Sequence, residues 1–102
     1  MNQAKKDFLS LVTPPARLGI EETAWFLGFN AHDISVLVSS GLLKPLGKPA
    51  SSGSKFFATV ELQNLRTDVR WLAKASDAIV HFWRDKNATR RVKGEEQTAI
   101  AG

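Results

Sequence analysis

The segment from Ile20 to Ser39, IEETAWFLGFNAHDISVLVS, constrains the fold more than any other part of the chain. It contains two short helical patterns, about 20–27 and 31–40, with Gly28 in the gap between them. Two helices that cross steeply through a tight turn need a residue that tolerates positive φ, and glycine does so without steric cost. They also need a small residue where they meet, and Ala24 stands four residues before the glycine. The segment therefore predicts two short helices packed across a tight turn.

The residues around this turn fit the same arrangement. Asn30 is a good N-cap for the second helix, and Asp33 falls near the positive end of its dipole. Apolar residues stand at the offsets that a shared core requires: Leu27, Phe29, Ile34 and Leu37. This spacing resembles the helix-turn-helix DNA-binding motif. It departs from that motif at Thr23, where an apolar residue is usual.

The segment that follows, 41–58, is broken by glycines and prolines and lies between two apolar pairs, Leu42-Leu43 and Phe56-Phe57. This pattern predicts a β-hairpin with a flexible tip. Together with Val60-Glu61-Leu62, it resembles the winged helix-turn-helix proteins of the excisionase and MerR-type families. The resemblance covers about residues 18–65.

A change of period at Thr59 predicts one long helix that reaches about residue 87 or 90, with Thr59 as its N-cap. Its apolar residues recur at spacings of three and four, with Ser76 at the one polar place in the series: Leu62, Leu65, Val69, Leu72, Ile79 and Trp83. Residues 92–102 are polar and small without periodicity, which predicts a disordered tail after a single domain, 1–91. The expected fold is mainly α, a winged helix-turn-helix with a short β-hairpin wing and a long C-terminal helix.

The long helix carries a wide apolar face, and large aromatic side chains on such a face are seldom left in water. In one interpretation, a short N-terminal helix, 4–12, folds back and covers this face within one chain. In the other, which we favour, two chains pair through it, as the long helices of MerR-type proteins do. The predicted homodimer interface consists of Leu72, Ile79, Phe82 and Trp83.

Charge and composition narrow the classes of function. The chain has 14 basic and 10 acidic residues, a net charge of +4 and a pI of about 9.8, which favours a polyanionic partner. Without cysteine it has no disulfide, thiolate nucleophile or cysteine-based zinc site. His32 and His81, its two histidines, have no cysteine partners and are not expected to form a metal site. We expect no enzyme activity, cofactor, metal, small-molecule ligand or membrane span, and a cytoplasmic location.

The resemblance implies that the second helix, about 31–40, enters the major groove of double-stranded DNA while the basic wing lies on the phosphate backbone. The residues that would contact DNA are Arg17, Asn30, Ala31, His32, Ser35, Val36, Ser39, Lys44, Lys48 and Lys55. The expected function is that of a transcriptional regulator or an excisionase-like architectural factor. The recognition helix has no arginine or lysine, however. The alternative is therefore a protein–protein interaction module, an adaptor or phage structural component, that retains the fold without DNA binding.

Overall fold

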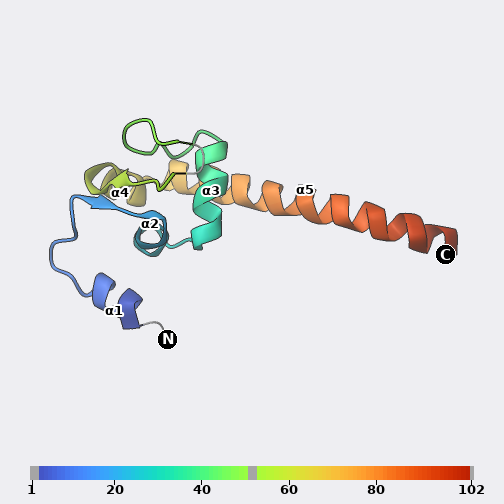
Figure 1. The fold of residues 1–102 in the computed structure, drawn as a ribbon, viewed down its shortest axis with the longest axis horizontal. Coiled ribbons are helices and arrows are strands. Elements are labelled where there is room, and N and C mark those ends of the chain that lie inside the picture. The colour runs from blue at the N-terminus through green and yellow to red at the C-terminus, as the bar shows by residue number, and fades with distance from the viewer. Residues whose placement is uncertain (1–2, 51–52, 102) are drawn as a thin grey trace.

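The computed structural model describes residues 3–50 and 53–101, with side chains described as far as Asn87. A small body is built mostly of short helices, and one long helix projects from it (Figure 1). The longest dimension is 58 Å, against 33 and 29 Å for the other two. The elements in chain order are α1 (Gln3–Leu9), β1 (Arg17–Leu18), α2 (Ile20–Leu27), α3 (Ala31–Ser39), β2 (Phe57–Ala58), α4 (Thr59–Arg66) and α5 (Val69–Ala101).

The two central helices, α2 and α3, lie where the sequence predicts them. Gly28 adopts φ 88°, and its N–H donates to the carbonyl of Ala24 at 2.8 Å, as does the N–H of Phe29. The N-terminus of α2 is capped by a hydrogen bond from the Gly19 N–H to Glu22 Oε1 at 3.0 Å. Local sequence therefore determines both the turn and the start of α2.

The core lies where α2, α3, α4 and the beginning of α5 meet. Its members come from every element except α1: Leu18, Ala24, Leu27, Ile34, Leu37, Leu43, Phe57, Leu62, Trp71 and Ala75. The spacing predicts Leu27, Ile34 and Leu37 in this core, and the structure buries all three. The prediction of a mainly α fold with a small antiparallel sheet and a long C-terminal helix is confirmed.

The pairing within the sheet differs from the predicted hairpin. β2 does lie at the end of the predicted wing, but its antiparallel partner is β1, with Leu18 opposite Phe57. Both side chains are buried, so the core determines this register. The loop between α3 and β2 is instead closed by a hydrogen bond from the Leu46 N–H to the Phe56 carbonyl at 2.8 Å. Pro45 and Pro49 have no N–H to donate to a ladder, which explains why this loop does not form a regular hairpin.

The prediction of one continuous helix from Thr59 is wrong at Thr67 and Asp68, where α4 ends and α5 begins. Asp68 Oδ1 accepts a hydrogen bond from the Trp71 N–H at 3.1 Å and so caps α5. The break directs Trp71 into the core, where its Nε1–H donates to the Leu42 carbonyl at 2.9 Å. α5 then continues to Ala101, so the backbone of 92–101, predicted as a disordered tail, is helical.

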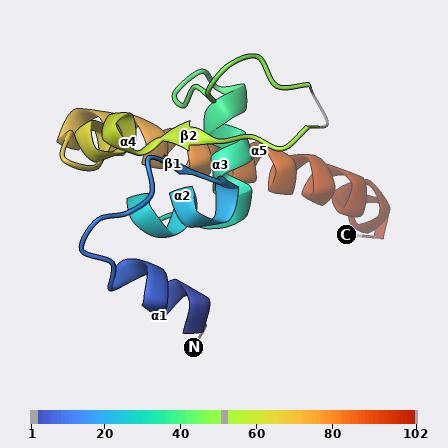
Figure 2. The same ribbon diagram turned by 60° about the vertical axis from the view of Figure 1, so that its left-hand side comes forward.

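The N-terminal helix α1 packs on α2, with the Phe8 and Trp25 ring centroids 5.8 Å apart. Figures 1 and 2 both place α1 beside α2 and away from α5. The interpretation in which α1 covers the apolar face of α5 therefore does not describe this fold. It is α3 that packs on α5. Within 3–50 and 53–101, no helix combines the length and the apolarity needed to cross a bilayer.

Thr23, the residue that departs from the helix-turn-helix pattern, is completely buried, and its hydroxyl has no hydrogen-bond partner among the described residues. We expect Thr23→Val to raise the free energy of unfolding by about 1 kcal/mol, because it removes an unsatisfied polar atom while retaining the shape of the side chain. Urea unfolding measures the change. Thr23→Ser is the matched control: it keeps the hydroxyl, loses a buried methyl group and should destabilise. A Val variant less stable than the wild type would contradict this interpretation.

Candidate nucleic-acid interface

The exposed face of α3 retains most of the residues predicted to read DNA. Exposed residues at its N-terminal end and along this face are Asn30, Ala31, His32, Ser35 and Ser39. Val36 is a correction, because its side chain is only 6% exposed. It lies one helical turn from Asp33, on the flank that contacts α5, and cannot face a groove.

One flank of this exposed face is formed by the loop that precedes β2. Lys55 from this loop, Ser35, Val38 and Ser39 from α3, and Ile20 from α2 line a hollow of about 250 Å³. A loop lysine is therefore brought beside two α3 hydroxyls from which it is separated by 16 or more residues of sequence. Hydroxyls and an ammonium group in this arrangement can donate to phosphate oxygens or to base edges.

Asp33 is the acidic residue that would repel a phosphate on α3, and the fold occupies both of its carboxylate oxygens. Oδ2 accepts a hydrogen bond from the Asn30 N–H at 3.1 Å, and Oδ1 accepts one from Trp83 Nε1–H at 3.3 Å. The side chain is buried. Asp33 therefore caps α3 and attaches it to α5, and it does not add a carboxylate to the exposed face.

The opposite flank of α3 is formed by α5, which the sequence did not indicate. The His32 ring lies 5.0 Å from that of Trp83 and 6.3 Å from that of Phe82, centroid to centroid. Lys86 Nζ lies 5.3 Å from the Trp83 ring centroid and 6.0 Å from that of Phe82. The exposed face of α3 is thus bordered by a lysine on each side, Lys55 and Lys86. The aromatic pair followed by Lys86 is visible in the sequence, but nothing local places it beside α3.

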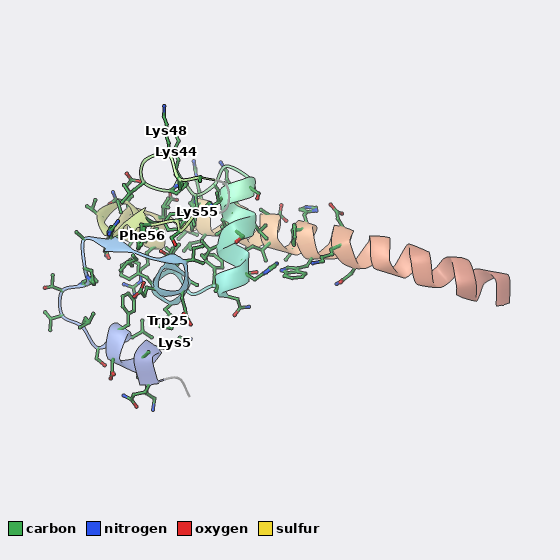
Figure 3. All side chains as sticks on the ribbon, in the orientation of Figure 1. Lys5, Trp25, Lys44, Lys48, Lys55 and Phe56 are labelled. Atoms are coloured by element: carbon green, nitrogen blue, oxygen red, sulfur yellow. The ribbon has the colours of Figure 1, made fainter. Side chains whose placement is uncertain are left out.

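The remaining basic residues of the predicted interface are spread over the loop and the sheet. Lys44 and Lys48 are exposed, and Figure 3 shows both extending away from the body, at the opposite end from Lys5. Arg17, on β1, places its Cζ 4.1 Å from the centroid of the Phe56 ring. This stacking holds Arg17 against the residue that follows Lys55.

The residues predicted as a dimer interface are mostly used within one chain. Leu72 and Ile79 pack against the core, and Trp83 is half-buried against α3. Phe82 is 39% exposed and is the member of the set that is most available to a partner.

The described part of the chain contains no group of three or more His, Asp or Glu side chains that could hold a metal ion. His81 Nε2 lies 3.5 Å from Asp77 Oδ2 on an exposed turn of α5. Comparison of the chain with protein-family models, with curated proteins and with solved structures gives no match.

Proposed function

We propose that the protein binds double-stranded DNA, with α3 in the major groove and the loop between α3 and β2 on the phosphate backbone. The observation that carries this proposal is the position of Lys55 beside the exposed hydroxyls of Ser35 and Ser39. An α-helix fits the major groove, and basic residues on its flank can then reach the phosphates that border the groove. Such a role suits a transcriptional regulator or an architectural factor, and we propose a cytoplasmic location with it.

Backbone contacts are expected to dominate the affinity. The exposed face of α3 offers hydroxyls, an imidazole and the methyl group of Ala31, which could contact a thymine methyl. It has no arginine or lysine for bidentate recognition of guanine. Lys44, Lys48 and Lys55 supply positive charge in the adjoining loop. We therefore expect modest sequence preference and a strong dependence on salt.

Binding of the purified protein to a fluorescent duplex of mixed sequence, measured at several salt concentrations, tests the proposal. Non-specific DNA binding of this kind has a Kd of about 10⁻⁴–10⁻⁶ M at physiological salt, and each phosphate contact contributes about −0.9 to the slope of log K against log salt. Three to five contacts predict a slope of about −3 to −4.5. A protein that remains folded and does not bind at 50 mM salt would contradict DNA binding.

A second candidate function, protein–protein interaction, is favoured by apolar side chains next to α1. Val12 is 98% exposed, and Leu9 and Leu11 are also exposed. With Phe8, these residues line a hollow of about 200 Å³. Absence of DNA binding would make this surface the better candidate for the functional site.

Pairing of two chains remains a prediction, and it now depends on Phe82 and on the part of α5 that projects from the body. Light scattering on the sample used for DNA binding measures the mass. A dimer mass would support pairing, and a monomer mass at the highest concentration used would contradict it without affecting the proposal for α3.

A further inference from the structure

We infer that the part of α5 just beyond the body, residues 84–93, is a second contact to the DNA backbone, on the flank of α3 opposite the loop. This inference rests on the proposed function and names the portion of the same DNA that α5 would bind. The wing of the predicted fold has no part in it.

The first observation is the distribution of charge. Residues 84–93, RDKNATRRVK, contain five basic residues and one acidic residue, a net charge of +4. This equals the net charge of the whole chain, so the other 92 residues sum to zero. At about 1.5 Å per residue the segment is roughly 15 Å long, which gives one positive charge about every 3 Å. One strand of double-stranded DNA has one negative charge about every 3.4 Å, and its phosphate backbone is therefore a partner of comparable charge spacing.

The second observation is the place where α5 leaves the body. It passes α3 at Trp83, whose Nε1–H donates to Asp33 Oδ1 and whose ring lies beside that of His32. Arg84 and Lys86 follow directly and are exposed. A duplex that lies against the exposed face of α3 would therefore have one border near Lys55 and the other near Lys86, which lies over the Trp83 ring. Figure 1 shows α5 continuing beyond α3 without a turn.

The third observation is the position of the Lys86 ammonium group on two aromatic rings. This group lies over the rings of Trp83 and Phe82, and the hydrogen bond to Asp33 fixes the Trp83 ring. A cation that is already held in place loses less conformational entropy when it contacts a phosphate than one on an unrestrained side chain. Lys86 is thus prepared to contact DNA at the junction between the body and the projecting helix.

The length of α5 indicates how much DNA is involved. From Trp83 to Ala101 the helix extends about 27 Å, which corresponds to roughly eight base pairs at 3.4 Å per step. Contacts along 84–93 would cover about half of this length. The contacted phosphates would lie beyond those that border α3, which makes the affinity depend on the length of the duplex.

The test compares two double variants of the full chain that each remove two positive charges. Arg84→Gln with Lys86→Gln alters the α5 segment. Lys5→Gln with Lys6→Gln alters exposed residues of α1, at the far side of the body (Figure 3). Each variant is titrated with duplexes of 12 and 24 base pairs between 50 and 200 mM salt, and its mass is measured by light scattering.

We expect the α5 variant to lower the salt slope by about 0.9 for the Lys86 contact, and by about 1.8 where the long Arg84 side chain also reaches a phosphate. Between 50 and 200 mM salt, it should therefore lose about 3.5-fold to 12-fold less affinity than the wild type loses. The preference for the longer duplex should also shrink, whereas the α1 variant should keep both the slope and the preference.

Equal slopes for the two variants, with wild-type protein that binds DNA, would overturn the α5 contact and leave the proposed function intact. A change of mass in the α5 variant alone would also overturn it, because the loss of affinity would then follow from assembly. A wild-type protein that does not bind either duplex would overturn both proposals.

Discussion

Replacing Trp71 with alanine is expected to lower the free energy of unfolding by about 3–5 kcal/mol. Trp71 is 8% exposed, and its ring makes an edge contact with Phe29 at a centroid distance of 6.3 Å. Its Nε1–H donates to the carbonyl of Leu42, just after α3. Truncation would leave a cavity where α3, α4 and α5 meet, together with an unsatisfied carbonyl. Because domains of this size are stable by only about 5–15 kcal/mol, the change would remove a large part of the total.

Guanidinium unfolding followed by far-UV circular dichroism measures this effect. Trp71→Phe separates the contribution of the buried ring from that of the hydrogen bond, because it retains an aromatic ring and loses the N–H. A smaller cost of about 1–3 kcal/mol is expected for it. Val69→Ala is the matched control on the same turn of α5: Val69 is 76% exposed, so its truncation should change stability by no more than about 0.5 kcal/mol. A loss below 1 kcal/mol for Trp71→Ala would show that Trp71 does not join α5 to the body.

The parts of the fold that could be predicted from sequence are those that neighbouring residues determine. Gly28 permits the positive φ that the turn adopts, and Ala24, Ile34 and Leu37 stand at offsets that meet across such a turn. The spacing therefore located α2 and α3 and most of their buried residues. Asp68 also carried a local signal, since an aspartate three residues before Trp71 can cap a new helix. Because the apolar residues keep the same helical period before and after Asp68, the sequence pattern predicts one helix where the structure has α4 and α5.

The rest depends on contacts between distant segments. β2 pairs with β1 because Leu18 and Phe57 are buried together, and no local pattern distinguishes that partner from one within the loop. Sequence spacing places Val36 on the exposed face, because it predicts one buried side of α3, the side with Ile34 and Leu37. The structure has two, since α5 packs on the flank that carries Asp33 and Val36.

In the candidate interface, too, some features follow from local sequence and others from contacts between distant segments. The exposure of Ser35 and Ser39 follows from the period of α3, whereas Lys55 reaches them only because the loop returns along the start of α2. The lysine on the other flank, Lys86, depends on the indole of Trp83 bonding to Asp33, 50 residues earlier in the chain. Residue types predicted a basic surface, and tertiary packing decided which cations border α3.

Removing the three lysines of the loop is expected to have the largest effect on DNA binding. If Lys44, Lys48 and Lys55 each contact a phosphate, changing all three to glutamine should lower the salt slope by about 2.7. The wild type would then lose about 40-fold more affinity than the variant between 50 and 200 mM salt. Lys44 and Lys48 are exposed, so the substitutions should leave the fold intact, which circular dichroism can verify.

Two further variants determine whether this effect belongs to the loop. The same three positions changed to arginine keep the charge and should keep the slope of the wild type. Lys5, Lys6 and Lys74 changed to glutamine remove equal charge from exposed positions on α1 and α5 and should leave the slope within about 0.9 of the wild-type value. If the loop variant retained the wild-type slope while DNA binding persisted, the loop would not lie on the backbone. The phosphate contacts would then have to come from basic residues outside the loop, such as those of α5 and Arg17.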